Sequence, residues 1–369
     1  MAGQGREYTS VEICAGAGGQ AVGLHKAGFR HRALIEIDEH ACQTLNHNIA
    51  KQGWTNCEIL ERDLNTFEST ELKPYLPETG LDLLAGGVPC PPFSVAGKQL
   101  GRDDERDLFP VVLRLVEDLK PRAVMIENVR GLLEPEHKFA AYRDAIRGRL
   151  IKAGYRILGW DVLEARDYGV PQLRPRAILV AMQEQAASYF KQPKSAAKVI
   201  TVADALEESM LERFGDSARG RAAYEKWRNK ALERGAVAPT LVGGSKKHGG
   251  ADLGPTRAKR AWAEFGIDGH GVADDPDEMK DPYRDLYGPR GPKLTVKQAA
   301  LIQGFPPDWE FCGRKTAAYR QVGNAFPPPV AQAVGEAIME ALKAEDSGVE
   351  RPDAPEGLIK SDLQSALAG

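Results

Sequence analysis

The chain has 369 residues, of which 42% are hydrophobic and 27% charged, a composition typical of a soluble globular protein with two ordinary domains. The net charge of −3 excludes a protein that is basic throughout, so any contact with a polyanion must come from a local patch. No apolar segment approaches the roughly 20 residues needed to span a bilayer, and residues 1–10 lack the apolar core of a signal peptide. We therefore expect a cytoplasmic protein.

Short apolar segments alternate with helical patterns in the first half of the chain. Helices are predicted from the glycine turn to about Gly28, at 39–53 and at 108–120. The predicted strands lie at residues 9–14, 32–38, 81–87, 121–129, 155–165 and 174–182. This alternation predicts an α/β fold with a parallel sheet covered on both faces. Such sheets bind ligands beyond the carboxyl ends of their strands.

The alternation stops near residue 185, and the composition then changes. Residues 200–290 are helical and charged at first and then rich in Gly, Lys, Arg and Asp, which indicates a second domain. Helical patterns return at 295–305 and 328–345. We expect a first domain over 1–190 that is completed by 317–345, a smaller domain over 191–316, and a flexible tail over 346–369.

A glycine loop, "AGAGG" at residues 15–19, follows the first predicted strand and opens a helix. Its glycines allow a tight turn and close approach to a ligand. Glu36 ends the next predicted strand, 20 residues after Gly16, where an acidic side chain suits a ribose hydroxyl pair. The glycine spacing does not match the G-x-G-x-x-G pattern of dinucleotide sites, so S-adenosylmethionine fits and a nicotinamide cofactor is the alternative. Asp63 is placed to accept a hydrogen bond from an adenine amino group, or else to cap a surface helix.

A cysteine lies in a stiff elbow, "GGVPCPPFS" at residues 86–94. Prolines on both sides of Cys90 exclude a regular helix or central strand there. Glu127 and Asn128 end the next predicted strand at the same edge of the sheet. In a later segment Arg174 and Arg176 alternate and therefore share one face. A thiol, a carboxyl group and a guanidinium group together suit nucleophilic catalysis. No pair among the five cysteines has metal-ligand spacing, so no metal site is predicted.

These motifs resemble those of the DNA (cytosine-5)-methyltransferases. The matching segments are "AGAGG", "VPCPPFS", "IENV", "PQLRPR" and "QVGNAFPPPV", in family order between about residues 10 and 340. The resemblance implies a Rossmann-like S-adenosylmethionine-dependent methyltransferase domain with a smaller target-recognition domain. It also implies transfer of a methyl group to C5 of a cytosine flipped out of duplex DNA, with S-adenosylhomocysteine as the other product and no metal.

The resemblance also implies roles for single residues. Cys90 becomes the nucleophile that adds to C6, Glu127 manages the proton at N3, and Arg174, with Arg176 nearby, holds the base oxygen. The cofactor would be held by Cys14, Gly16, Gly18, Gly19, Glu36, Ile37, Asp63, Leu64, Pro89, Asn324 and Ala325. Three of these depart from the family pattern, which usually has an aromatic residue at positions 14 and 37 and a serine at 325.

Contacts with DNA are expected from two segments. Residues 98–109 resemble the mobile loop that follows the nucleophile, and Ser94, Lys98 and Arg102 suit contact with the DNA there. The stretch 240–262 lies in the expected target-recognition domain and contains five cationic residues and one acidic residue, Asp252. These cations, suited to phosphates and guanine edges, are Lys246, Lys247, Arg257, Lys259 and Arg260.

Three other functions compete with this interpretation. A nicotinamide-dependent oxidoreductase is opposed by the glycine spacing and the thiol elbow. A transfer RNA cytosine-5 methyltransferase keeps the chemistry and changes the polymer. A DNA-binding protein without catalysis is opposed by the complete catalytic set. The favoured interpretation is a bacterial modification enzyme that binds double-stranded DNA as a monomer, with a cognate restriction endonuclease as a further partner acting on the same site.

Overall fold

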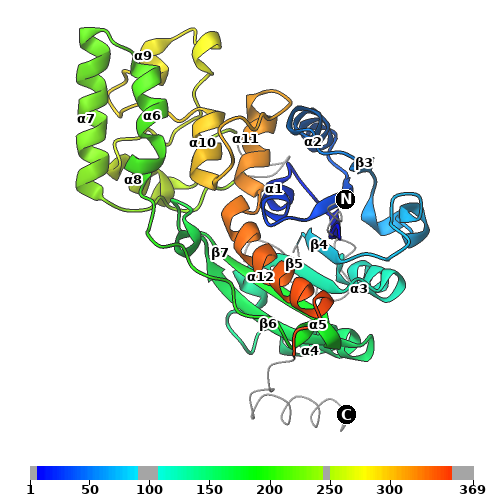
Figure 1. The fold of residues 1–369 in the computed structure, drawn as a ribbon. Helices are drawn as coiled ribbons and strands as arrows, with labels where there is room; N and C mark the ends of the chain where they lie inside the picture. Colours follow the sequence, from blue (N-terminus) through cyan, green and yellow to red (C-terminus); the bar gives the residue numbers. More distant parts are fainter. Residues whose placement is uncertain (1–5, 90–106, 244–249, 351–369) are drawn as a thin grey trace.

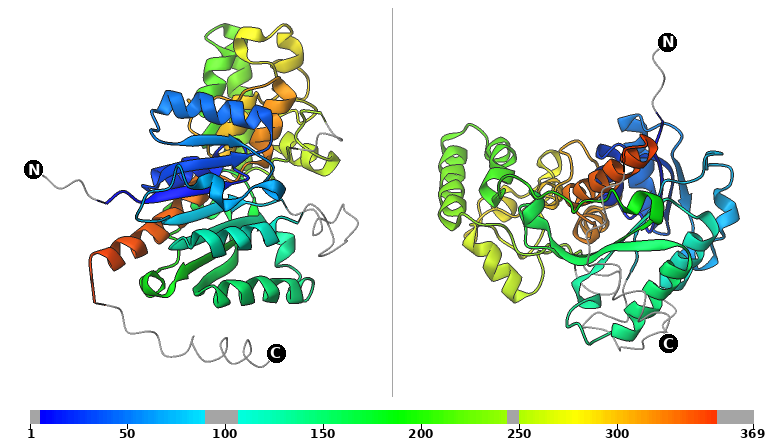
Figure 2. Two further views of the ribbon diagram at one scale, coloured as in Figure 1. Left: turned by 90° about the vertical axis from the view of Figure 1, so that its right-hand side faces the viewer. Right: turned by 60° about the horizontal axis from the view of Figure 1, so that its bottom comes forward.

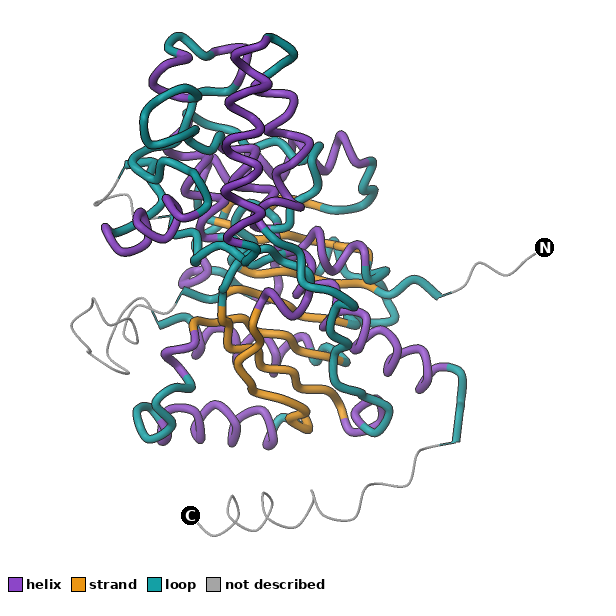
Figure 3. Tube along the Cα trace, turned by 90° about the vertical axis from the view of Figure 1, so that its left-hand side faces the viewer, coloured by secondary structure: helices purple, strands orange, loops and turns teal. Residues whose placement is uncertain are grey.

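The computed structural model describes residues 6–89, 107–243 and 250–350, and the strands of these residues form one seven-stranded sheet (Figure 1). The strand order is β3-β2-β1-β4-β5-β7-β6. The bounds are β1 Thr9–Ile13, β2 Arg30–Glu36, β3 Glu58–Glu61, β4 Leu83–Gly87, β5 Ala123–Val129, β6 Tyr155–Glu164 and β7 Pro175–Gln183. The strands stack as one layer beneath a separate group of helices (Figure 3).

The expectation of an all-parallel sheet is wrong for one strand. β7 pairs antiparallel with both β5 and β6, while β1 to β5 pair in parallel. The physical reason is the connection between Glu164 and Pro175, which holds only a short 3-10 turn. A parallel crossover needs a dozen or more residues and usually a helix. Because β7 runs in the opposite direction, its first residues reach the edge where β4 and β5 end.

Helices cover both faces of the sheet. Their bounds are α1 Gly19–Lys26, α2 Glu39–Gln52, α3 Phe109–Leu119, α4 Ala140–Lys152, α5 Glu184–Ala187, α6 Val202–Phe214, α7 Ala218–Arg234, α8 Thr256–Glu264, α9 Pro282–Asp285, α10 Val296–Gln303, α11 Lys315–Asn324 and α12 Pro328–Asp346. Apolar residues of α1 and α12 are buried against one face, and those of α3 and α4 against the other. Among the described residues, no helix is both long and apolar enough to cross a membrane.

A buried ion-pair network fastens the last long helix to the sheet. Asp82, which is 2% exposed, pairs with Arg6 at 2.8 Å and with Arg122 at 3.0 Å. Arg122 also pairs with Glu345 and Asp346 at the end of α12. α12 begins at Pro328, whose fixed φ and missing N–H suit the first turn of a helix. The end of α12 is therefore tied to the sheet by ion pairs.

Helices α6 to α9 form a group beside the sheet, at the upper left of Figure 1 and the top of the left view in Figure 2. Their core is continuous with that of the sheet domain, because Trp227 and Trp262 belong to the same buried cluster as Leu34 and Leu45. The bridge runs through residues 305–312, which lie before the expected boundary at 317. There Trp309 donates from its indole N–H to the carbonyl of Ala17 at 3.1 Å.

Candidate active site

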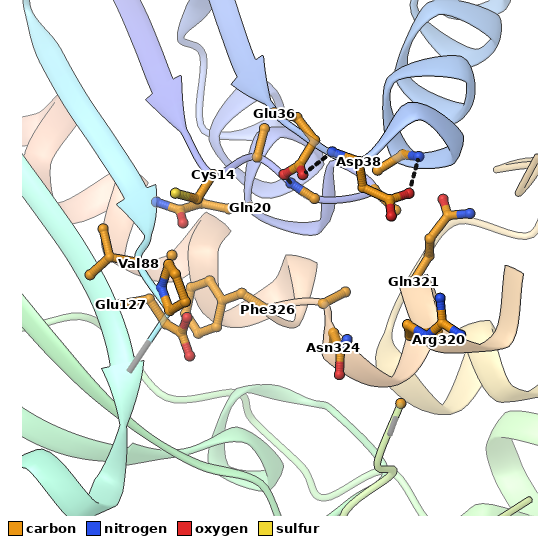
Figure 4. Close-up of a pocket in the computed structure, with 18 of the residues that line it drawn as sticks. Cys14, Gln20, Glu36, Asp38, Val88, Glu127, Arg320, Gln321, Asn324 and Phe326 are labelled. Carbon is orange, nitrogen blue, oxygen red and sulfur yellow. Dashed lines mark hydrogen bonds between the residues drawn. The ribbon is translucent and has the colours of Figure 1, made fainter. Parts of the chain in front are cut away.

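A pocket of about 590 Å³ opens where β1, β2, β4 and β5 end and β7 begins (Figure 4). Its volume lies within the range of small-molecule sites, roughly 300–1,000 Å³. Glu36 and Asp38 line one side, and Val88 and Glu127 line another. The parallel strands place these residues together because their carboxyl ends share one edge. The site therefore lies at the edge that the sequence predicted.

The glycine loop is tied to the second strand by Glu36. One oxygen of this carboxylate accepts from the backbone N–H of Gly16 at 2.7 Å, and the other accepts from the N–H groups of Ile37 and Asp38 at 2.8 Å. Gly18 has a φ of +84°, and a Cβ there would lie 2.8 Å from Leu45. A Cβ on Gly19 would lie 2.2 Å from the Phe326 carbonyl oxygen. The loop therefore requires glycine at positions 18 and 19, and Oε2 of Glu36 keeps one lone pair for a ligand.

The pocket is also lined by residues that the sequence analysis expects to contact the adenosine part of the cofactor. Ile37 is 62% exposed and Leu64 is buried. Asp63 caps the 3-10 turn Leu64–Thr66 by accepting from the Asn65 N–H, and it also lines the pocket, so both roles weighed for it are compatible with the structure. Cys14 lines the pocket with a φ of 51°, and burial raises the pKa of its thiol, so it stays protonated.

The opposite end of the pocket holds a carboxylate and a guanidinium in direct contact. Arg176 Nε lies 2.8 Å from Glu127 Oε1, and both side chains are mostly buried. This contact follows from the register, because Arg176 pairs with Val129 across the β5–β7 ladder. Burial raises the pKa of Glu127, while Arg176 and Arg174 oppose the rise. The site therefore favours a proton on Glu127 more than an exposed glutamate would.

Arg174 lines the same pocket, but backbone carbonyls engage both of its Nη atoms. It is 1% exposed, and its Nη atoms donate to the carbonyls of Leu241, Gly323 and Ala325 at 2.8–2.9 Å. Its guanidinium thus joins β7 to the segments that precede α8 and follow α11. Nε alone lacks a partner among the described residues. This geometry favours Arg176, and not Arg174, as the arginine that meets a base.

The described chain reaches the thiol elbow at Pro89. Val88 and Pro89 line the pocket, and the buried side chain of Asn128 donates to the Val88 carbonyl at 3.3 Å. Asn128 therefore anchors the segment that leads to the nucleophile. Cys90 itself lies outside the described residues, as do Ser94, Lys98 and Arg102 of the expected DNA-contacting loop.

The closing motif completes the pocket from α11. Asn324 and Ala325 line it, and the backbone of Gly323 lies against residues 242–243. Sequence reasoning missed further residues that line the pocket, among them Gln20 and Phe326. It also missed Trp309, which supports the glycine loop through its hydrogen bond to Ala17. Gln20 lies in the second position of α1, so the helix that the glycine loop opens was the signal for it. Phe326 lies within the segment "QVGNAFPPPV" that carried the resemblance, but it was not singled out there. Trp309 comes from a distant segment and left no local signal.

The pocket fits an elongated nucleoside. One end offers Glu36 and Asp63, the other offers Glu127 and Arg176, and the floor carries two buried side chains with orphaned polar atoms, Glu12 and Gln20. Within the described residues, no cluster of three or more His, Cys, Asp or Glu side chains is arranged to hold a metal ion.

Comparison with known proteins agrees with this geometry. The profile of the family described as C-5 cytosine-specific DNA methylase matches residues 8–340. The chain belongs to that family. It is 50% identical over 343 residues to the Type II methyltransferase M.NaeI of Lentzea aerocolonigenes, covering 92% of this chain and 77% of the relative. It is 47% identical over 346 residues to the Type II methyltransferase M.NgoMIV of Neisseria gonorrhoeae, covering 92% of this chain and 100% of the relative.

The resemblance drawn from the motifs is thereby confirmed, and the protein is a DNA (cytosine-5-)-methyltransferase, whose relatives M.NaeI and M.NgoMIV carry the name Type II methyltransferase. Members of this family use S-adenosylmethionine. The fold is similar to a prophage-encoded DNA modification methyltransferase of E. coli, with a TM-score of 0.61, 22% identity and coverage of 91% and 100% of the two chains. It is also similar to DNMT2 of Spodoptera frugiperda, with a TM-score of 0.56, 17% identity and coverage of 90% and 100%. The methyltransferase fold is confirmed.

The expected DNA-contacting cations of this methyltransferase fall into two groups. Arg257 and Arg260 are exposed on α8, whereas Lys259 is half-buried and its Nζ lies 2.8 Å from Asp252 Oδ2. Lys246 and Lys247 lie outside the described residues. Arg257 and Arg260 are therefore available to a polyanion, while Lys259 is already neutralised.

We predict that Gly323→Ala impairs the methyltransferase severely. A Cβ at position 323 would lie 2.3 Å from the backbone nitrogen of Gly243, so α11 and the cofactor-lining Asn324 must shift. A displacement of about 1 Å in a catalytic site can lower the rate of methyl transfer about 100-fold. Initial rates at saturating DNA measure this effect. Gly148→Ala is the matched control, because a Cβ there meets nothing within 4 Å in the interior of α4, and an unchanged rate for Gly323→Ala would contradict the prediction.

The stability of the ligand-free methyltransferase should fall as the pH rises, because of Glu12. This side chain is 1% exposed, its Oε2 has no described partner, and burial raises its pKa well above the usual value. The unfolded chain then loses this proton first, so the free energy of unfolding falls by up to about 1.4 kcal/mol per pH unit above roughly pH 4.3.

Glu12→Gln removes this titration. We therefore expect the stability advantage of the variant to grow between about pH 5 and about pH 8. Urea unfolding of both proteins at several pH values measures it. Parallel stability profiles for the two proteins would show that Glu12 ionises normally in the folded state.

Proposed function

We propose that the methyltransferase transfers a methyl group to C5 of a cytosine flipped out of a specific short duplex sequence, through a covalent bond between Cys90 and C6. The observation that carries this proposal is the Glu127–Arg176 pair, at 2.8 Å, at the end of the pocket that Val88 and Pro89 also line. A cytosine placed there has an acid, a cation and the neighbouring thiol within one site.

The proposed reaction begins at the thiolate. Cytosine C5 is a poor nucleophile, and addition of the Cys90 sulfur to C6 breaks the C5–C6 double bond and gives an enamine-like ring. C5 of this ring would then attack the methyl group, whose bond to the sulfonium sulfur breaks, so that S-adenosylhomocysteine is the leaving group. Negative charge that builds on the ring is met by a proton from Glu127 at N3. The C5 proton then leaves to a base, the C5–C6 double bond re-forms and the thiolate departs. N3 returns its proton to Glu127, which leaves neutral 5-methylcytosine and regenerates both Cys90 and Glu127.

We assign the contact with the base oxygen to Arg176. Its pairing with Glu127 places its guanidinium at the acid, and a guanidinium stabilises developing negative charge. Arg174 serves instead as a positioning residue, because its Nη atoms are engaged by three backbone carbonyls. S-adenosylmethionine, when bound, supplies an activated methyl group. Glu36, Asp63 and Asn324 are the residues proposed to hold it, with Ile37, Leu64 and Ala325 packing beside them.

Extrusion of the base costs a few kcal/mol, which must come from contacts with the surrounding duplex. We propose that helices α6 to α9 and the loop after Val242 form the target-recognition domain. Action as a monomer and a cognate restriction endonuclease are further parts of the proposal. The Type II names of the relatives support the second of these.

We expect Arg257→Ala and Arg260→Ala each to reduce the salt dependence of DNA binding. Each phosphate contact contributes about 0.9 to the slope of log K against log salt, so each variant should lower the slope by about that amount. Lys259→Ala is the matched control, because its ammonium already pairs with Asp252 at 2.8 Å. Filter binding or anisotropy across a salt series measures the slopes, and an equal change in all three variants would contradict the assignment.

The deciding experiment maps 5-methylcytosine at base resolution after incubation with S-adenosylmethionine and unmodified duplex DNA, with Cys90→Ala alongside. Methylation at one short motif that is absent in the variant would support the proposal. Methylation of transfer RNA but not of DNA would favour the alternative polymer.

A duplex with 5-fluorocytosine at the mapped target tests the covalent step. After methyl transfer no C5 proton can leave, so Cys90 should stay bonded to the DNA in a complex that resists denaturing electrophoresis. Methylation of ordinary DNA without such a complex would contradict the Cys90–C6 bond.

A further inference from the structure

Gln20 is a buried side chain whose hydrogen-bonding groups are unused. It is 3% exposed, and neither Oε1 nor Nε2 has a hydrogen-bond partner among the described residues. A buried amide without partners is costly, and native proteins satisfy nearly all such groups. Gln20 lines the active-site pocket, where Figure 4 shows it beside Cys14. The missing partner is therefore to be sought in a ligand.

Both hydrogen-bond donors and hydrogen-bond acceptors without partners surround Gln20. It is the second residue of α1, so the N–H groups of this first turn have no partner within the helix and favour an anion. Glu12, from the strand that leads into the glycine loop, lines the same pocket with Oε2 unpartnered and buried. This region therefore offers donors to a carboxylate and acceptors to an ammonium group.

The rest of the pocket leaves this region to one part of the cofactor. Under the proposed function, Glu36 and Asp63 bind the nucleoside, and the methyl group faces a base that lies beside the Glu127–Arg176 pair. What remains is the α-amino acid, which carries a carboxylate and an ammonium group. Figure 4 places Gln20 between Glu36 on one side and Val88 and Glu127 on the other, where this third branch would leave the sulfur.

We propose that the Gln20 amide binds the amino-acid end of the cofactor, with Nε2 donating to the carboxylate and Oε1 accepting from the ammonium group. This inference rests on the proposed cofactor site. An amide matches a zwitterion because its nitrogen is a donor, its oxygen is an acceptor, and both are bonded to the same carbon. Gln20 thereby distinguishes the complete cofactor from nucleosides that lack the amino acid.

The test compares two ligands that share the adenosine and the thioether. S-adenosylhomocysteine carries the amino acid, and 5′-methylthioadenosine lacks it. Calorimetry with the full chain, without DNA, gives both dissociation constants for the wild type and for Gln20→Met, which keeps the length of the side chain. We expect Gln20→Met to weaken the binding of S-adenosylhomocysteine about 10- to 100-fold, as for lost hydrogen bonds to charged groups. The binding of 5′-methylthioadenosine should weaken by less than about twofold.

Two further variants make the comparison sharp. Gln20→Glu places a carboxylate against the carboxylate of the ligand and should show the same selective loss. Gln321→Met is the matched control, because Gln321 lines the same pocket but its amide already bonds to Thr44 and Cys312. We expect this control to change the two affinities by similar factors.

The outcomes distinguish a failure of the role proposed for Gln20 from a failure of the proposed cofactor site. Loss confined to S-adenosylhomocysteine in both Gln20 variants supports the proposal. Equal weakening of both ligands makes Gln20 a structural residue and overturns it, as does no weakening of either. If the wild type binds neither ligand, the proposed cofactor site itself is overturned, whatever the variants do.

Discussion

Replacing Glu127 with glutamine is expected to lower the rate of methyl transfer by about 100- to 10,000-fold, the usual contribution of a positioned acid or base. Glutamine keeps the size of the side chain and removes the proton that the carboxyl group delivers. Binding of S-adenosylhomocysteine should change little, because Glu127 lies at the opposite end of the pocket from Glu36 and Asp63. Single-turnover rates at saturating cofactor and DNA separate the two effects.

The pKa of Glu127 also predicts in which direction the rate of methyl transfer changes with pH. Burial raises the pKa of Glu127, so its acid form persists to higher pH than that of an exposed glutamate. The wild-type rate should therefore fall as the pH rises through this elevated pKa, and Glu127→Gln should lose that limb of the profile. A variant that keeps the wild-type rate and profile would show that the proton at N3 comes from another group.

Replacing Arg174 with methionine should destabilise the protein by about 3–5 kcal/mol. Arg174 is 1% exposed, and its removal takes the side-chain donor from the carbonyls of Leu241 and Gly323 and one of two donors from that of Ala325, which Gln303 Nε2 also reaches. Because these carbonyls come from two segments that enclose the pocket, we also expect weaker cofactor binding. Urea unfolding gives the loss of stability, and calorimetry gives the loss of affinity.

Arg228→Met is the matched control for Arg174. Arg228 lies on α7 and pairs with Glu207 at 2.9 Å on the exposed surface, where an ion pair contributes about 0–1 kcal/mol. The two arginines differ chiefly in burial and in the number of acceptors they hold. Equal stability losses in both variants would refute the view that Arg174 is a structural clasp.

Most strands and helices of the sheet domain could be predicted because each has its own local pattern, although β3 and α4 were not among the predicted elements. The carboxyl-edge location of Glu36 and Glu127 follows from the order of these elements alone, and both line the pocket. The direction of β7 was also encoded, in the absence of a helix between residues 164 and 175. The expectation of a uniform parallel sheet overlooked this short connection.

The roles of single residues were harder to predict, because they depend on contacts between distant segments. Arg174 and Arg176 share one face of the chain, and only the approach of residues 241 and 323–325 separates a structural arginine from one that meets Glu127. Gln20 carries no motif of its own, and its importance rests on the absence of partners, which the sequence does not record.

The indole of Trp309 has a consequence for how the two ligands of the enzyme influence each other. It bonds to the carbonyl of Ala17 in the glycine loop, and it belongs to the core that is continuous with helices α6 to α8. A tilt of those helices on DNA binding would therefore act on the glycine loop of the proposed cofactor site. Binding at one site then changes the affinity at the other, and thermodynamic linkage makes this effect reciprocal. DNA should tighten or loosen the cofactor by the same factor by which the cofactor tightens or loosens DNA.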